Sequence, residues 1–190
     1  MGRSGSKLVH SLIVNEMFSN KLLGALNSTF ISDLHSRPFY DGQVIKSHCC
    51  FDERFYDEKS VYLYVYGDIV DCVISNHLKF KSDKTWKRNH LRNFANVDLE
   101  ISDDAILSSD ILSLTENFMS WKIASIRYTN IALINFESLF LDTTRISELT
   151  GLKIPVPGMR ARKIENVRQD YDVDSIRLAY KDLDRLIKNE

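Results

Sequence analysis

The chain has 190 residues, of which 25 are basic and 26 acidic, and its formal net charge is −1. A length near 190 residues suits one globular domain, and 44% hydrophobic residues can bury a core, which excludes wholesale disorder. Three cysteines make no disulfide framework and no apolar run approaches the ~18 residues of a membrane span, so we expect a cytoplasmic protein without a membrane span.

Hydrophobic periodicity predicts helices and strands in alternation. The strongest strand covers 60–66 (Ser-Val-Tyr-Leu-Tyr-Val-Tyr), which is β-branched and aromatic throughout, as expected of a strand buried on both faces. Pro38 and Gly42 mark residues 35–42 as a loop. In chain order, we predict a helix over about 7–18 that restarts near 20, strands at 43–46 and 60–66, helices over 71–80 and 111–126, a strand over 129–136, a helix over 142–149 and a last helix capped by Asp174 and Ser175.

Strands that alternate with helices indicate an α/β fold with a mainly parallel sheet. Ligands of such sheets bind at the carboxyl ends of the strands. The loops 2–7, 46–52 and 66–71 hold that position, so the functional residues are expected there. We expect the tail 169–190 to pack as an amphipathic helix on a main domain of residues 1–168.

The first of these loops, Gly2-Arg3-Ser4-Gly5-Ser6-Lys7, stands directly before a predicted helix. Glycines let backbone N–H groups curl around an anion, and the helix N-terminus adds positive potential. Ser4 and Ser6 add hydroxyl donors, while Arg3 and Lys7 add charge. The loop suits an anion, and the alternative is an ordinary disordered terminus.

The second loop contains Lys46-Ser47-His48 at the end of a predicted strand. A histidine there can act as a general base near pH 7, because its reference pKa is about 6.5. An ordinary packed or surface histidine is the alternative interpretation.

The third loop leads from Gly67-Asp68 into a helix that carries Asp71 and Ser75. These two residues are four apart, so a carboxylate and a hydroxyl share one helical face. An ordinary polar helix surface would look the same in the sequence.

Charge is divided between two stretches. Residues 79–92 hold six Lys and Arg against Asp83 alone, and residues 98–116 hold six acidic residues and no basic one. Each stretch suits a solvated face. The basic one, which includes Trp86, could also contact nucleic acid, but no nucleic-acid-binding module accompanies it. We expect it to border an anionic cofactor or acceptor.

Four segments, in this order, resemble the sulfotransferase superfamily, whose enzymes use 3′-phosphoadenosine 5′-phosphosulfate (PAPS) on a P-loop-like α/β fold. The segments are Arg3-Ser4-Gly5-Ser6, Lys46-Ser47-His48, the run from Asp68 through Asp71 to Ser75, and Phe136-Glu137-Ser138-Leu139. The resemblance covers about residues 2–155. It implies a three-layer fold in which helices flank a mainly parallel central sheet.

The resemblance also implies a role for each matched residue. The backbone amides of residues 4–7, with the Ser4 and Ser6 hydroxyls, would hold the 5′-phosphosulfate. Arg3 would neutralise charge on the transferring sulfuryl group. His48 would remove the proton from the acceptor hydroxyl, and Lys46 would support the phosphosulfate. Ser75 would bind the 3′-phosphate, for which Arg160, Arg162 and Lys163 are further candidates.

The sequence departs from the family pattern at several points. Gly67 stands where an arginine would bind the 3′-phosphate, and Lys7 stands where a small hydroxyl residue is usual. The late glycine-rich segment is replaced by the differently spaced Gly158-Met159-Arg160-Ala161-Arg162-Lys163. The strand expected ahead of the phosphate loop is absent from the sequence, which suggests a copy shortened at its N-terminus.

We therefore expect a sulfotransferase that moves a sulfuryl group from PAPS to a hydroxyl of a carbohydrate or small-molecule acceptor, with no metal and no nucleic acid. The alternative is a degenerate, inactive binding or interaction module that keeps the fold. A nucleotide kinase of the P-loop type fits less well, because no lysine stands in the Walker register. The sequence indicates neither the acceptor nor the oligomeric state.

Overall fold

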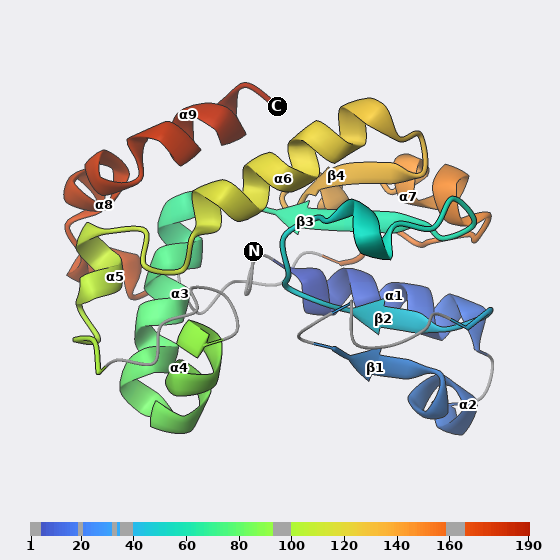
Figure 1. The fold of residues 1–190 in the computed structure, drawn as a ribbon, viewed down its shortest axis with the longest axis horizontal. Helices are drawn as coiled ribbons and strands as arrows, with labels where there is room; N and C mark the ends of the chain where they lie inside the picture. Colours follow the sequence, from blue (N-terminus) through green and yellow to red (C-terminus); the bar gives the residue numbers. More distant parts are fainter. Residues whose placement is uncertain (1–4, 19–20, 32–33, 35–39, 93–99, 159–165) are drawn as a thin grey trace.

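The computed structural model describes residues 5–18, 21–31, 34, 40–92, 100–158 and 166–190 (Figure 1). Its strands are β1 (Ser28–Phe30), β2 (Val44–Lys46), β3 (Tyr62–Tyr66) and β4 (Ile131–Asn135). Its α-helices are α1 (Ser6–Met17), α2 (Lys21–Leu26), α3 (Ile69–Ser82), α4 (Lys84–His90), α5 (Ala105–Ser108), α6 (Leu114–Arg127), α7 (Thr144–Thr150), α8 (Val173–Ala179) and α9 (Lys181–Lys188). The predicted α/β character is confirmed.

The strands form two separate sheets. β1 pairs with β2, and β3 pairs with β4, each pair being parallel. The described strands therefore do not confirm the predicted single central sheet, although its parallel character is confirmed. Strand β1 was not predicted, because three residues with a partly exposed pattern carry no periodic signal.

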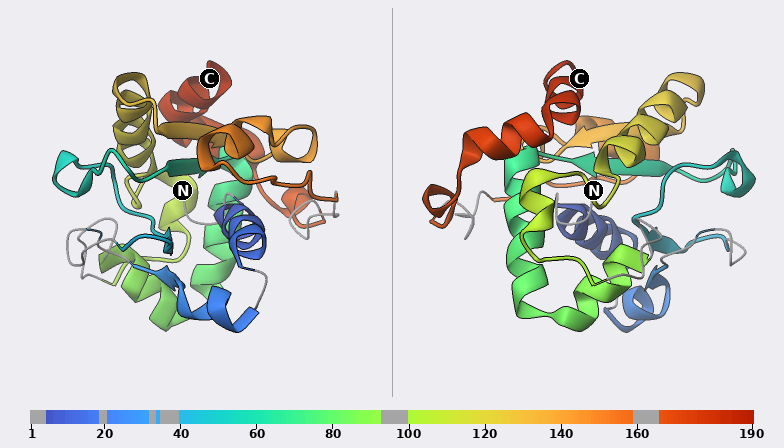
Figure 2. Two further views of the ribbon diagram at one scale, coloured as in Figure 1. Left: turned by 90° about the vertical axis from the view of Figure 1, so that its right-hand side faces the viewer. Right: turned by 60° about the vertical axis from the view of Figure 1, so that its left-hand side comes forward.

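Helices cover the two faces of the β3–β4 pair. Alternate side chains of β3 meet α6 on one face, where Tyr64 stacks on Trp121 with ring centroids 5.7 Å apart. The other face packs against α1 and α7, which contribute the buried Val9 and Ile146. Figure 2 shows α1 and α6 on opposite sides of these strands. This alternation explains why the strand is apolar throughout: both of its faces are buried.

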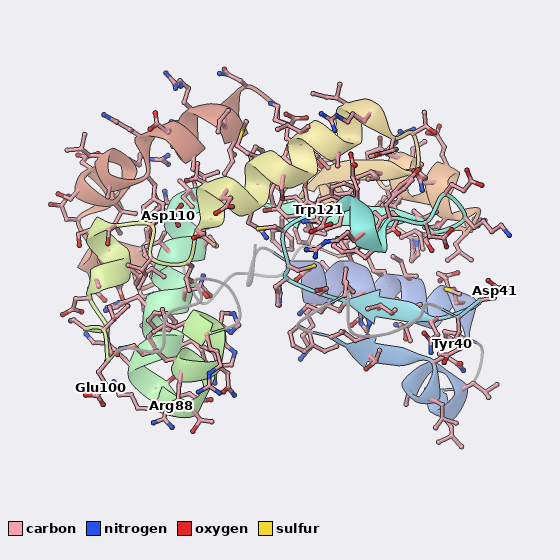
Figure 3. The ribbon with its side chains drawn as sticks, viewed as in Figure 1. Tyr40, Asp41, Arg88, Glu100, Asp110 and Trp121 are labelled. Atoms are coloured by element: carbon pink, nitrogen blue, oxygen red, sulfur yellow. The ribbon has the colours of Figure 1, made fainter. Side chains whose placement is uncertain are left out.

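Helix α6 begins at an acidic cap. The carboxylate of Asp110 accepts hydrogen bonds from the backbone N–H groups of Leu114 and Thr115 at 2.7 and 2.8 Å. These are two of the N–H groups that a helix start leaves without a partner within the helix. Figure 3 shows Asp110 at this end of the helix and Trp121 further along it. The cap fixes the residue at which α6 begins, and so fixes the position along β3 that Trp121 contacts.

The C-terminal part of the described chain contains two helices, where one was predicted. Tyr180 separates α8 from α9, and its hydroxyl donates to the backbone carbonyls of Ile106 and Ser109, each at 2.8 Å. The cap is also different from the prediction, because Asp172 accepts from the Ser175 N–H at 3.0 Å. The helices pack on α3, α5 and α6. The apolar stripe was recognised, but the anchored tyrosine that breaks the helix was not.

The basic and acidic stretches pair with each other. Lys84 and Lys87 contact the carboxylate of Asp103 at 2.5 and 2.7 Å. Lys87 also donates to the backbone carbonyl of Ile101. Much of the predicted charge of residues 79–92 is thus used to hold α4 against the segment before α5. None of the helices in the described part of the chain combines the length and apolar character needed to cross a membrane.

Candidate functional site

The carboxyl ends of β2, β3 and β4 face the region where α1 begins (Figure 1). Gly5 precedes α1 with φ +91°, a left-handed conformation that favours glycine. A Cβ at this position would lie 1.7 Å from Cδ2 of Phe136, the residue that follows β4. The start of α1 is therefore fixed at the end of β4, as the predicted position of the first loop requires. Arg3 and Ser4 of that loop lie outside the described residues.

Ser6 is the first residue of α1 and lines a cavity of about 410 Å³. Its hydroxyl oxygen is buried and has no hydrogen-bond partner among the described residues. No side chain caps the helix either, so its first backbone N–H groups keep their positive potential. Lys7 is exposed on the helix surface and does not line this cavity. Ser6 is thus the described residue of the first loop whose hydroxyl group is available to the cavity.

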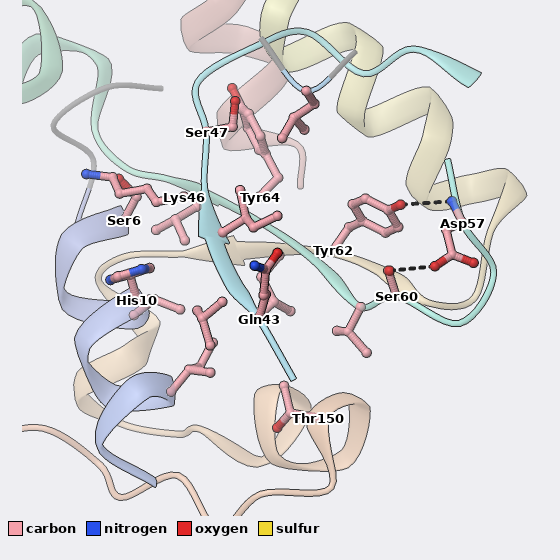
Figure 4. Close-up of a pocket in the computed structure, with 18 of the residues that line it drawn as sticks. Ser6, His10, Gln43, Lys46, Ser47, Asp57, Ser60, Tyr62, Tyr64 and Thr150 are labelled. Carbon is pink, nitrogen blue, oxygen red and sulfur yellow. Dashed lines mark hydrogen bonds between the residues drawn. The ribbon is translucent and has the colours of Figure 1, made fainter. Parts of the chain in front are cut away.

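The structure brings Lys46, Ser47 and His48 to the same cavity, at the end of β2. Figure 4 shows Lys46 and Ser47 across from Ser6. Ser6 of the first loop and residues 46–48 of the second thus line one cavity. Lys46 is a cation at this end of the cavity, and it lies close enough to lower the pKa of both His48 and His10.

His48 is a strongly perturbed histidine. Burial, assisted by the nearby Lys46 and His90, lowers its pKa to about 2. Its ring lies 5.3 Å from the ring of Phe30 and 5.9 Å from that of His90. At neutral pH the imidazole is uncharged, so it can accept a proton, but its low pKa makes it a weak base. A bound anion would raise that pKa, because a nearby negative charge favours the protonated form.

Sequence reasoning missed two histidines, His10 and His90. His10 lies one turn after Ser6 on α1 and lines the cavity, with its Nε2 3.1 Å from the Ser28 hydroxyl. His90 stacks on Trp86 with ring centroids 3.6 Å apart, and so places the end of α4 beside His48. The i, i+4 spacing from Ser6 could have indicated His10. His90 has no such local signal, since α4 reaches the site only through tertiary packing.

The predicted 3′-phosphate segment is surrounded by ion pairs within the protein. Asp68 caps α3 by accepting from the Asp71 N–H at 3.1 Å. Arg168 contacts Asp71 at 2.6 Å, and Arg177 contacts Asp68 at 3.0 Å. Ser75 lies half-buried in the middle of α3 and is not among the residues that line the cavity. The structure does not group Ser75 with Ser6, Lys46 and His48.

Gly67 lies beside an acid. A Cβ built on Gly67 would be 3.4 Å from each carboxylate oxygen of Glu137. A cation expected at this position is thus replaced by a bare glycine with a negative neighbour, which disfavours a phosphate here. Arg160, Arg162 and Lys163, the other candidates for that phosphate, lie outside the described residues. Within the described chain, no group of three or more His, Cys, Asp or Glu is arranged to hold a metal ion.

The cavity extends from this polar end along the space between β2 and β3. Its lining includes Val9 and Ile13 of α1 below the strands and Trp121 of α6 on the other side. No known protein family, curated protein or solved structure matches this chain. Functional inference therefore depends on the geometry of the chain itself.

Proposed function

We propose that this chain is a sulfotransferase-like protein with a P-loop-like three-layer fold. In this proposal it transfers a sulfuryl group from PAPS to a hydroxyl of a carbohydrate or small-molecule acceptor. The observation that supports it is that Ser6, Lys46 and His48 line one cavity where a helix begins and parallel strands end. Helices on both faces of the β3–β4 pair support the layered fold.

The phosphosulfate would lie at the start of α1. The unpartnered Ser6 hydroxyl and the first backbone N–H groups of α1 would donate to its oxygens. Lys46 would neutralise charge as the acceptor oxygen forms its bond to sulfur and the bond from sulfur to the leaving phosphate oxygen breaks. Preorganised donors of this kind are usually the largest contribution to catalysis of group transfer.

His48 would take the proton that the acceptor hydroxyl loses. The dianionic end of the cofactor would raise its pKa from the low value of the empty site. Base strength would then depend on bound cofactor, so His48 would become an effective base once the cofactor is bound. Proton transfer by a positioned side chain contributes about 10²–10⁴-fold to the rate.

A titration with adenosine 3′,5′-bisphosphate (PAP), followed by thermal unfolding, tests the cofactor site. A ligand that binds only the folded chain raises its stability by about 2.7 kcal/mol at a hundredfold excess over its Kd. We expect Lys46→Ala to weaken PAP binding about tenfold. The exposed Lys181 of α9 provides the matched control, and Lys181→Ala should leave binding unchanged. If PAP does not bind at ~1 mM, the active enzyme is ruled out, because a Kd of this size corresponds to a binding free energy of only about −4 kcal/mol.

A second experiment separates binding from transfer. Transfer of labelled sulfate from PAPS should fall at least about 100-fold in His48→Ala while PAP binding persists. Loss of both in this variant, with an unchanged unfolding temperature, would assign His48 to the binding site and not to proton transfer.

The second candidate function is an inactive binding module that keeps the fold. The Glu137 carboxylate beside Gly67 favours it, because Gly67 itself supplies no cation for a 3′-phosphate. This candidate predicts a folded protein that binds inorganic sulfate or pyrophosphate at the α1 end of the cavity but discriminates poorly between PAP and adenosine 5′-phosphate. The active enzyme predicts at least about tenfold preference for PAP, which corresponds to ~1.4 kcal/mol.

A further inference from the structure

The two sheets leave two strand edges facing each other. In a parallel ladder, alternate residues of a strand direct their N–H and C=O groups to opposite edges. The Val44 N–H donates to Asn27 and the Lys46 carbonyl accepts from Ile31, so these two residues of β2 face β1. Ile45, which stands between them, directs its peptide groups to the other edge.

Strand β3 likewise has one edge that is paired, with β4, and one edge that points away from β4. The Tyr62 N–H donates to Asn130 at 2.9 Å, and the Tyr66 carbonyl accepts from the Phe136 N–H at 2.7 Å. These even-numbered residues face β4, so Leu63 directs its peptide groups away from β4. Within the described part of the chain, the peptide groups of Ile45 and Leu63 have no hydrogen-bond partner. One residue on each edge, Ile45 of β2 and Leu63 of β3, therefore offers an unused donor and acceptor to the space between the sheets, whereas the Gln43 N–H already donates to the Tyr40 carbonyl.

The cavity occupies this space. Its lining includes residues 43–49, which cover β2, and residues 60–65, which cover most of β3 (Figure 4). We call the part between Gln43–Ile45 and Val61–Leu63 the strand slot. β2 and β3 run in the same direction along it, with their carboxyl ends toward the start of α1 (Figure 1).

The walls of the strand slot above and below the strands are apolar. Val9 and Ile13 of α1 close one face, and Leu34 and Trp121 close the other. A strand in this position would therefore bury side chains on both of its faces, as the central strands of parallel sheets do. Its sequence must be apolar at every position, not only at alternate ones.

We propose that the strand slot binds an extended polypeptide strand of a partner protein, parallel to β2 and β3 and apolar on both faces. The bound strand would join the two pairs into one parallel sheet of five strands. This is β-strand addition, in which backbone hydrogen bonds give affinity and side-chain pockets give specificity. The strand would occupy the slot that adjoins the polar end with Ser6 and Lys46, and binding of the peptide and binding of PAP are measured separately, so either proposal can fail without the other.

The unused peptide groups favour a strand over a small apolar ligand. They stand on both sides of the cavity, one residue on each edge, and an extended polypeptide supplies a matching donor and acceptor to both edges at once. The described segments of this chain do not supply the strand. Each of β1 to β4 already has its place, and residues 173–188 pack on α3, α5 and α6.

The charges at the two ends of the strand slot favour one orientation. Asp41, Asp57 and Lys59 line its end near the start of the strands, where acidic groups are in excess. Lys46 and the positive N-terminus of α1 lie at the carboxyl end. A partner strand with basic residues before its apolar run and acidic residues after it would complement both ends in the parallel direction.

The test uses a synthetic peptide of about nine residues, a length typical of strands. It carries lysines, then alternating valine and isoleucine, then aspartates, and its binding to the full chain is measured by calorimetry. A second peptide of the same sequence carries N-methyl groups on the alternate amides that would pair with one edge. We expect saturable binding of the first peptide, and binding at least about tenfold weaker for the second, because each methyl group removes a donor.

Protein variants test the same edges. Ile45→Pro removes an N–H group that faces the strand slot and leaves the ladder to β1 intact, since proline is tolerated where the N–H is unused. We expect this variant to unfold at nearly the wild-type temperature and to bind the peptide at least about tenfold more weakly. Ile45→Val, which keeps the N–H group, should bind as the wild type does. If Ile45→Pro does not fold, the N-methylated peptide decides the question on the unchanged protein.

Three outcomes would overturn the proposal. Equal binding of the methylated and unmethylated peptides would show a pocket for apolar ligands and not a strand site. Binding of the reversed sequence, with aspartates first, as tightly as the designed one would exclude the parallel orientation. Failure of the separate peptide to bind at ~1 mM, combined with stabilisation when the same strand is fused ahead of Met1, would show that the strand slot takes a strand of its own chain.

Discussion

Gly5 and Phe136 are in direct contact, although 130 residues of chain separate them. A Cβ on Gly5 would overlap the Phe136 ring at 1.7 Å, and the backbone of Gly5 has φ +91°. This contact fixes the start of α1 at the end of β4 and so determines where the N-terminus of the helix points.

Gly5→Ala should therefore destabilise the protein by about 2–4 kcal/mol, which combines the cost of a left-handed alanine with that of displacing a packed ring. Urea unfolding measures this cost. Gly151→Ala is the matched control, because Gly151 has φ +68° and no atom within 4 Å of its Cβ position. It should cost only about 1 kcal/mol. Equal costs for the two variants would contradict the contact with Phe136.

The low pKa of His48 makes stability depend on pH. Its pKa is about 2 in the folded chain, chiefly because it is buried, whereas an unfolded histidine titrates near 6.5. Between these values the unfolded chain binds the additional proton. The stability contribution is complete above about pH 6.5 and is lost as the pH falls, by up to about 1.4 kcal/mol per pH unit.

Urea unfolding between about pH 7.5 and pH 5.5 measures this dependence. His48→Gln should reduce the slope of the free energy of unfolding below pH 6.5. His10→Gln should reduce it less, although burial lowers the pKa of His10 in the same direction. An unchanged slope in His48→Gln would show that His48 is accessible to protons in the folded protein.

The strand over 60–66 and that over 129–136 could be predicted because their apolar runs report burial directly. Periodicity does not report which strands are neighbours. The predicted single sheet is not confirmed for that reason, since the space between β2 and β3 is a property of the assembled chain. β1 was missed because three partly exposed residues have no period to detect.

The candidate site could also be predicted only in part, where the signal lies along the chain and not in tertiary packing. Ser6, Lys46 and His48 were predicted from their place after strands or before a helix, and the structure brings them together. His90 reaches His48 from α4, a helix that the basic composition of residues 79–92 concealed. Ser75 was predicted from spacing along the chain, but spacing along α3 does not carry it to the cavity.

Lys87 should contribute more to stability than Lys84, although both contact Asp103. Lys87 is mostly buried, with 12% of its side chain exposed, and it also donates to the Ile101 carbonyl. We expect Lys87→Ala to cost about 1–2 kcal/mol, because it leaves buried acceptors unpaired. Lys84, which is 66% exposed, should cost at most about 0.5 kcal/mol.

Salt distinguishes these two contributions. Raising the ionic strength to about 1 M shortens the Debye length to ~3 Å, which should abolish the effect of Lys84→Ala and leave most of that of Lys87→Ala. Asp103 adds a pH dependence, because the hydrogen bonds from the two lysines lower its pKa to about 2. The stabilisation is present above pH ~4 and is lost as the pH falls toward 2. Equal costs for both lysine variants in high salt would contradict the assignment.

The substitution Gly67→Arg tests whether the end of β3 is a degenerate phosphate site. Gly67 has no positive φ, and the nearest atoms to its Cβ position are at the ordinary contact distance of 3.4 Å. An arginine can therefore be accepted, and its guanidinium would both neutralise Glu137 and offer two donors to a phosphate. We expect PAP to bind at least about tenfold more tightly to this variant than to the wild type, as measured by calorimetry. This gain equals ~1.4 kcal/mol, within the range of one charge-assisted hydrogen bond.

Two control variants make this result specific. Gly67→Ala changes the backbone freedom without adding charge and should leave the affinity for PAP unchanged. Glu137→Gln removes the negative neighbour alone and should recover only part of the gain, because it supplies no new cation. Adenosine 5′-phosphate, which lacks the 3′-phosphate, should bind equally to the wild type and to Gly67→Arg. A gain for both nucleotides would mean that the arginine attracts anions in general, and that the end of β3 is not where a 3′-phosphate would lie.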